Sequence, residues 1–177
     1  MAESAIHRSM ALRIEGLCEA RLVQIAFYAR SGSGSAGHLP IPAGLTADGC
    51  FTFSPAPGRV MLYSPVSSGW SGTADAVPPH FGCVTELSHS RSAYVVSGSG
   101  AERFLASLFA IDFSTASFPI GKGIATVHHE APVYLIRAAA DAFHCLVARS
   151  FGRDFETVMR NVAKGWDDAR AADLQPR

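Results

Sequence analysis

The chain has 177 residues, and its 15 Lys and Arg side chains balance 15 Asp and Glu side chains, so its formal charge is zero. This balance argues against a nucleic-acid binder or a polybasic membrane-binding protein, because both need a surplus of positive charge. Charged residues make up only 17% of the sequence, below the about 25% that is usual for a soluble domain, and a charge-poor surface favours association with other proteins.

The N-terminal part predicts one strand and no targeting segment. Charged side chains interrupt Met1 to Arg30, so there is no signal-peptide core, and no apolar run in the chain approaches the about 20 residues of a membrane-spanning helix. Residues 1–19 carry no clear period, whereas Leu22–Tyr28 predicts a mostly buried strand. The four cysteines form no Cys-x-x-Cys pair, which indicates reduced thiols and a cytoplasmic protein.

The next part of the chain alternates loop-like segments with two short strands. Residues 31–37 have the Ser/Gly composition of a flexible linker, and a proline-rich stretch follows at 38–42. Strands are predicted at Cys50–Phe53 and Arg59–Tyr63, with turn residues at 55–58. Residues 64–82 read as a long structureless stretch, and their Trp70 is either an interface anchor or is folded back onto the core of its own chain.

The second half is more regular and predicts five strands and two helices. The strands are expected at Val84–Leu87, Ala93–Ser97, Gly123–His128, Val133–Arg137 and Ala142–Val147. The first two are joined by a turn at Ser88–Ser92, and residues 98–100 open a helix with apolar positions at i, i+3, i+4 and i+7. Because consecutive strands joined by short turns pair antiparallel, the expected class is α+β, with antiparallel sheets and helices.

The last element is the most clearly marked helix. Ser150 is placed to cap it, and a buried stripe begins at Phe151. Gly165 is a natural stop, which leaves 166–177 as a polar, frayed tail. Trp166, just beyond the stop, allows the same two interpretations as Trp70.

A glycine pair sits where a dinucleotide-binding fingerprint would lie. Gly98 and Gly100 stand between a strand and a helix, but the third glycine position is Arg103. The flanking elements also do not form a parallel βαβ series. A plain tight turn therefore accounts for the two glycines better than a cofactor site.

Two adjacent groups carry metal-ligand residue types. They are His128-His129-Glu130 and His144-Cys145. Neighbouring side chains on a strand point to opposite faces, so neither adjacent pair is expected to share an ion. No recognised ligand spacing joins the groups, and histidines satisfied within their strands account for them better.

A third group supplies the residue types of a catalytic triad. Glu86, Ser88 and His89 lie close together with Ser90 beside them. However, the sequence has no Gly-x-Ser-x-Gly elbow, and a polar turn accounts for the group as well. Arg149, just before the last helix, either contacts a carboxylate or phosphate of a ligand or partner, or forms a salt bridge near the helix start.

Four segments between Val84 and Ala163 follow one another in a characteristic order. They are Val84–Ser90, Val95–Ala101 with Phe104–Ala106, Ile111–Phe113 with Ala116–Gly121, and Phe143–Phe151. In this order and spacing they resemble the gamma subunit of heterotetrameric sarcosine oxidase, a relative of the folate-binding aminomethyltransferase fold. Arg21–Ile25 and Pro55–Leu62 look like the first strand and the Gly-Pro turn of that family.

The resemblance implies a non-catalytic subunit of a flavin-dependent oxidase. In that family the alpha subunit binds NAD and contributes a tetrahydrofolate site, the beta subunit carries FAD and covalent FMN, and the delta subunit holds zinc. The gamma subunit carries no cofactor and supports the assembly, so no catalytic, cofactor-binding or metal residue is expected in this chain. The complex would demethylate sarcosine or a related N-methyl amino acid and pass the one-carbon unit to tetrahydrofolate.

The resemblance also implies a folate-binding-like fold, and its strand-strand-helix-strand-strand-strand-helix order agrees with the periodicity of the second half. We therefore expect one domain over 1–177 with two subdomains, 1–82 and 83–165, and a tail at 166–177. The alternative is a stand-alone folate-binding one-carbon module. It would need a carboxylate that hydrogen-bonds the pterin, for which Glu86 and Glu130 are the candidates.

Overall fold

The structure is a computed structural model that describes residues 4–8, 11–28, 44–46, 49–66, 77–78, 80 and 82–173. The predicted linker at 31–37, the proline-rich stretch at 38–42 and Trp70 lie outside the described residues. No helix in the described part of the chain is both long and apolar enough to cross a membrane. The four cysteines all lie among the described residues, and none of them forms a disulfide bond.

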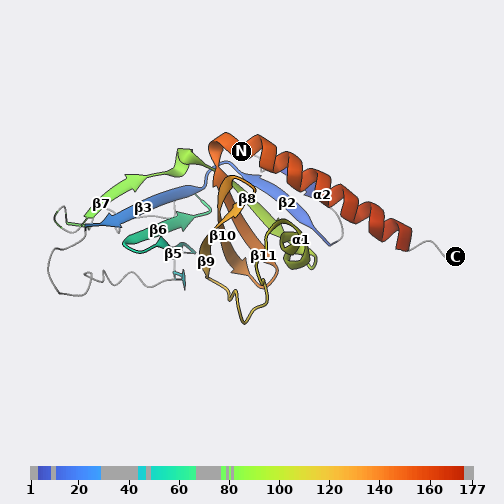
Figure 1. Ribbon diagram of the computed structural model, residues 1–177, viewed down its shortest axis with the longest axis horizontal. Coiled ribbons are helices and arrows are strands. Elements are labelled where there is room, and N and C mark those ends of the chain that lie inside the picture. The colour runs from blue at the N-terminus through green and yellow to red at the C-terminus, as the bar shows by residue number, and fades with distance from the viewer. Residues whose placement is uncertain are drawn as a thin grey trace.

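The chain forms two antiparallel sheets with few helices, which confirms the predicted α+β class (Figure 1). The six-stranded sheet has the order β1-β2-β8-β11-β10-β9. Its strands are β1 (Ser4–Arg8), β2 (Arg13–Leu17), β8 (Arg91–Ser97), β9 (Gly123–His128), β10 (Ala131–Ala139) and β11 (Ala142–Ala148). The five-stranded sheet has the order β4-β5-β6-β3-β7. Its strands are β3 (Arg21–Phe27), β4 (Gly44–Leu45), β5 (Phe51–Ala56), β6 (Arg59–Ser64) and β7 (Gly82–Glu86).

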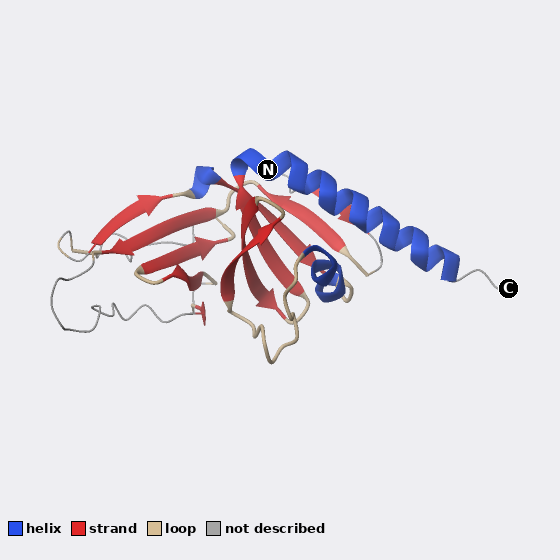
Figure 2. Cartoon of the chain, viewed as in Figure 1, coloured by secondary structure: helices blue, strands red, loops and turns tan. Residues whose placement is uncertain are grey.

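Among the described residues, two α-helices and two short 3₁₀-helices complete the fold (Figure 2). They are η1 (Ser88–Ser90), α1 (Ala101–Leu108), η2 (Arg149–Phe151) and α2 (Gly152–Asp173). From β7 onward, the elements follow in the order that the periodicity predicts: two strands, a helix, three strands and a helix.

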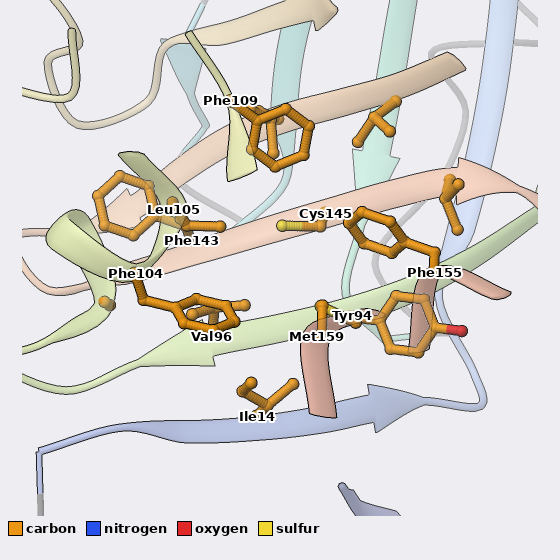
Figure 3. Close-up of a cluster of buried hydrophobic side chains, with 14 of the residues drawn as sticks. Ile14, Tyr94, Val96, Phe104, Leu105, Phe109, Phe143, Cys145, Phe155 and Met159 are labelled. Atoms are coloured by element: carbon orange, nitrogen blue, oxygen red, sulfur yellow. The ribbon is translucent and has the colours of Figure 1, made fainter. Parts of the chain in front are cut away.

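The alternation of side chains along the six-stranded sheet builds one core on each face. On the helix face, Phe104 of α1 and Phe155 of α2 pack in one buried cluster with Tyr94, Val96 and other strand residues (Figure 3). On the opposite face, Ala93 and the other intervening residues pack against β3, β5 and β6 of the five-stranded sheet. Successive residues of a strand point to opposite faces, so the six-stranded sheet lies between the helices and the second sheet.

Two features of the strands differ from the prediction. The N-terminal residues without a clear period form β1 and β2, and Ile14 of β2 is fully buried. The neighbours β7 and β8 do not pair: β7 pairs with β3, while β8 pairs with β2 and β11. The two sheets therefore draw their strands from interleaved parts of the chain, because β2 joins the six-stranded sheet and β7 the five-stranded sheet.

The terminal helix also differs at both ends. Ser150 lies in the 3₁₀-helix η2 instead of capping α2, which begins at Gly152. The predicted stop at Gly165 is wrong, because α2 continues to Asp173 and the expected tail is largely helical. Glycine costs a helix only about 1 kcal/mol relative to alanine, and Trp166 holds the next turn by packing edge-on against Phe104 of α1.

A buried arginine anchors the long connection between α1 and β9. Arg137 is only 2% exposed, and its guanidinium donates hydrogen bonds to the carbonyl oxygens of Phe113 (2.5 Å), Phe118 (3.2 Å) and Ala140 (2.5 Å). The same guanidinium lies over the ring of Phe143. The bonds to Phe113 and Phe118 tie the connection to β10, which fixes the path of residues 109–122.

Candidate functional site

A cleft of about 480 Å³ opens where the two sheets meet. It is lined by Leu17, Cys18, Glu19, Ala20, Arg21, Leu22, Tyr63, Glu86, Ser88, His89, Arg91, Ala93, Leu146 and Arg149. These residues come from both sheets, from the β2–β3 connection and from the two 3₁₀-helices. The cleft therefore exists because the chain crosses between the sheets at this point.

The cleft brings together four residues that the sequence singled out separately. Glu86, Ser88, His89 and Arg149 all line it. The fifth, Ser90, is absent from the lining, and its hydroxyl donates to the carbonyl oxygen of Leu87 at 2.6 Å.

Ser88 has the contacts of a structural residue. Its hydroxyl donates to Oε1 of Glu86 and accepts a 2.8 Å hydrogen bond from the backbone N–H of Leu22. His89 is exposed, and no hydrogen bond in the described structure joins it to Ser88. A catalytic triad places the histidine between the serine and the carboxylate, whereas here Ser88 bonds Glu86 directly and ties η1 to the start of β3.

Hydrogen bonds to both of its oxygens stabilise the charged form of Glu86. Arg21 Nε donates to its Oε2 at 3.2 Å, and the backbone N–H of Ser88 donates to its Oε1 at 3.3 Å. Burial raises the pKa of Glu86, but the hydrogen bonds from Ser88 and Arg21 outweigh this and hold it below its usual value. Glu86 and Arg21 therefore neutralise each other at one wall of the cleft.

Arg91 and Arg149 are neighbours in the lining of the cleft and form its arginine wall. The Arg91 guanidinium stacks 4.4 Å from the ring centre of Tyr134, and its Nη1 donates to the carbonyl oxygen of Pro132 at 3.2 Å. Arg149 Nη2 donates to the carbonyl oxygen of Arg91 at 3.0 Å. Sequence reasoning missed Arg21 and Arg91, since no local pattern marks them. The antiparallel pairing of Arg91 with Ala148 is what places Arg91 beside Arg149.

The floor of the cleft reaches a buried polar pair. Tyr63 lines the floor, and a 2.7 Å hydrogen bond joins its hydroxyl to Nδ1 of His144. Burial lowers the pKa of His144 to about 4 and raises the pKa of Tyr63. The neighbouring Cys145 lies in the core on the helix face, and burial raises its pKa to about 12. His144 and Cys145 thus point to opposite faces, as predicted for adjacent strand residues.

A second cavity, of about 460 Å³, holds the other histidine group. His128, His129 and Glu130 line it together with Asp154 and apolar residues of η2 and α2. The prediction that His128 and His129 diverge is wrong, because their ring centres are 4.5 Å apart. His129 lies past the end of β9 in a turn, with a left-handed φ of 51°.

Two histidines alone make a weak metal site. His128 Nδ1 is 3.0 Å from the carbonyl oxygen of Leu108, and its Nε2 is buried without a hydrogen-bond partner. Within the described ranges, no group of three or more His, Cys, Asp or Glu side chains is placed to hold a metal ion.

Gly98 and Gly100 let the turn before α1 pack closely against the backbone of Ala11. Gly98 has a φ of 106°, and a Cβ on it would lie 2.6 Å from the carbonyl oxygen of Ala11. The N–H of Gly100 donates to the same oxygen at 2.8 Å. Only glycine tolerates this approach and this backbone conformation, so the tight-turn interpretation accounts for both residues.

The chain matches no protein-family model and no curated protein sequence. Its fold is similar to that of a chain in the structure of heterotetrameric sarcosine oxidase from Corynebacterium sp. U-96 in complex with pyrrole 2-carboxylate, with a TM-score of 0.69 and 18% sequence identity. The similarity covers 91% of this chain and 88% of that chain. The two chains therefore share one fold along nearly their whole lengths.

Proposed function

We propose, from this shared fold, that the chain is a non-catalytic, gamma-like subunit of a multi-subunit flavin-dependent oxidase. The enzyme would demethylate sarcosine or a related N-methyl amino acid and pass the one-carbon unit to tetrahydrofolate. The observation that carries the proposal is the extent of the match. A chain of almost the same length, from a heterotetrameric sarcosine oxidase, has the same fold over 91% of this chain. FAD, FMN, NAD, zinc and the folate site would belong to the partner subunits.

The surface of the described residues supports a role in an assembly. Several large apolar side chains are exposed: Tyr28, Leu45, Val66, Val84, Ile120 and Val127. In the described part of the chain, β7 pairs on one side only, with β3, and its residues 83–86 are exposed. An open sheet edge offers unpaired backbone groups to another chain, and a partner subunit would cover it.

Co-purification tests this proposal directly. The tagged chain, isolated gently from its source cells, should bring down larger flavin-containing partners, and the purified complex should oxidise sarcosine or another N-methyl amino acid. Val84→Lys at the open edge should weaken the association, whereas Arg153→Gln on the exposed side of α2 serves as the matched surface control. A chain that purifies without partners, or that oxidises the amine alone, would contradict the proposal.

Tetrahydrofolate titration separates the proposal from the stand-alone folate module. The Glu86 carboxylate already accepts hydrogen bonds from Arg21 and Ser88, which leaves it poorly placed to bind a pterin. We therefore expect no saturable tetrahydrofolate binding by the purified chain. Saturable binding that Glu86→Gln or Glu130→Gln abolishes would favour the module instead.

A further inference from the structure

We infer that the cleft between the two sheets binds a small organic anion through a carboxylate or phosphate group. The lining of the cleft supports this independently of the proposed function. Three features of the cleft carry the inference: its charge, the way its arginines are held, and its size and floor.

The cleft carries more positive than negative charge. Arg21, Arg91 and Arg149 face two carboxylates, Glu86 and Glu19. Glu86 is matched by Arg21, and Glu19 is exposed. Among the described residues, neither Arg91 nor Arg149 has an ion-pair partner. Two guanidinium groups thus share one wall with no carboxylate bound to either.

The arginine wall is preorganised. Arg91 is fixed by its stack on Tyr134 and by its hydrogen bond to Pro132, and its own carbonyl oxygen positions Arg149. Each of these two guanidinium groups donates a single hydrogen bond in the described structure, although a guanidinium has five N–H donors. Fixed guanidinium groups with spare donors match the planar oxygens of a carboxylate or phosphate.

The size and floor of the cleft indicate the kind of molecule that fits. Its volume of about 480 Å³ falls within the about 300–1,000 Å³ that is typical of small-molecule sites. Leu22, Ala93 and Leu146 make part of the lining apolar, while Tyr63 adds an aromatic face. The ligand is therefore a small organic acid or a phosphate ester, with its anionic end toward Arg91 and Arg149 and its apolar part on the floor.

Calorimetric titration of the full chain, in whatever assembly it purifies, tests the inference. The probes are succinate and inorganic phosphate, with succinamide as the neutral match to succinate. We expect succinate or phosphate to bind saturably, and succinamide not to bind. The Arg149→Gln variant should bind the anion about tenfold more weakly, as expected for the loss of a charge-assisted hydrogen bond, and Arg153→Gln, outside the cleft, should bind as the unchanged chain does.

The outcomes separate a free ligand site from a contact with a partner subunit. Binding of succinate alone identifies an organic acid as the ligand class, and binding of phosphate alone identifies a phosphate ester. The inference would be overturned if Arg149→Gln and Arg91→Gln both bound the anion as tightly as the unchanged chain does. It would also be overturned if neither succinate nor phosphate bound. Loss of the assembly in Arg149→Gln, together with no anion binding by the intact complex, would also overturn it and would assign the arginines to an acidic segment of a partner subunit.

Discussion

Tyr63 and His144 join the two sheets through a hydrogen bond of 2.7 Å between the tyrosine hydroxyl and Nδ1 of the histidine. Tyr63 belongs to β6 of the five-stranded sheet, and His144 belongs to β11 of the six-stranded sheet. Both side chains are buried, so the pair is stable only while His144 is neutral. The contact between the sheets is therefore sensitive to acid.

The first prediction is that stability falls as pH drops below the usual pKa of histidine. The pKa of His144 is lowered from 6.5 to about 4, so the unfolded chain binds the extra proton first. The contribution of neutral His144 to the free energy of unfolding is fully present above pH 6.5 and is lost as pH falls toward 4. The loss lowers the free energy of unfolding by about 3 kcal/mol. Urea unfolding at a series of pH values measures it.

Two variants identify the group responsible for this pH dependence. His144→Gln should flatten the profile between these pH values, whereas His89→Gln, at an exposed position, should leave the slope unchanged. A slope that persists in His144→Gln would assign the effect to another residue.

The second prediction concerns the buried arginine of β10. Arg137→Met removes the donors of four carbonyl oxygens, two in the 109–122 connection and two at and after the end of β10, so we expect a loss of about 3 kcal/mol. Arg137→Lys should recover little, because an ammonium cannot span these carbonyls as a guanidinium does. Denaturant unfolding measures both, with the exposed Arg153→Met as the control. A change within experimental error in Arg137→Met would show that the connection is anchored elsewhere.

The third prediction tests the contact between β9 and β5. A Cβ on Gly123 would lie 2.5 to 2.8 Å from three atoms of Phe53, so Gly123→Ala should destabilise the chain by about 1–3 kcal/mol through overpacking. Gly123→Ala should cost less in a chain that also carries Phe53→Ala, because that substitution removes Cγ and Cδ1, two of the three atoms. The double-mutant cycle gives the coupling, and purely additive effects would mean that the two residues do not meet.

The fourth prediction is a substitution that makes the chain more stable. Gly165 lies inside α2, and a Cβ there meets no atom within 4 Å. Gly165→Ala should therefore stabilise the chain by up to about 1 kcal/mol by favouring the helical backbone. A higher thermal midpoint checks it. An unchanged or lower midpoint would argue that the helix ends at Gly165 in solution.

Sequence reasoning predicted elements whose local pattern matches their packing. The β9–β10–β11 meander and α1 carry strong periodicity and were placed within a few residues of their observed ends. β2 was missed because a five-residue strand that contains Gly16 has little periodicity of its own, and its burial depends on pairing with β8. The β7–β8 pairing failed because the intervening η1, held by Ser88, sends the chain into the other sheet.

The candidate site shows the same limit. Glu86, Ser88, His89 and Arg149 were recognised as polar residues with functional potential, but nothing local indicated that they share one cleft. Arg21 and Arg91 went unnoticed for the same reason. Their proximity depends on which strands pair, and pairing between distant segments produces no local pattern in the sequence of either strand.

The interleaved order of the strands has a consequence for how the chain is made. Arg13 of β2 pairs with Ser97 of β8, and β8 in turn pairs with β11. β2 therefore leaves the ribosome long before β8 exists, and the six-stranded sheet is complete only when Ala148 has been synthesised. Pairing between distant segments slows folding and prolongs the exposure of unpaired strands, so the growing chain is at its most aggregation-prone before β11 has been translated.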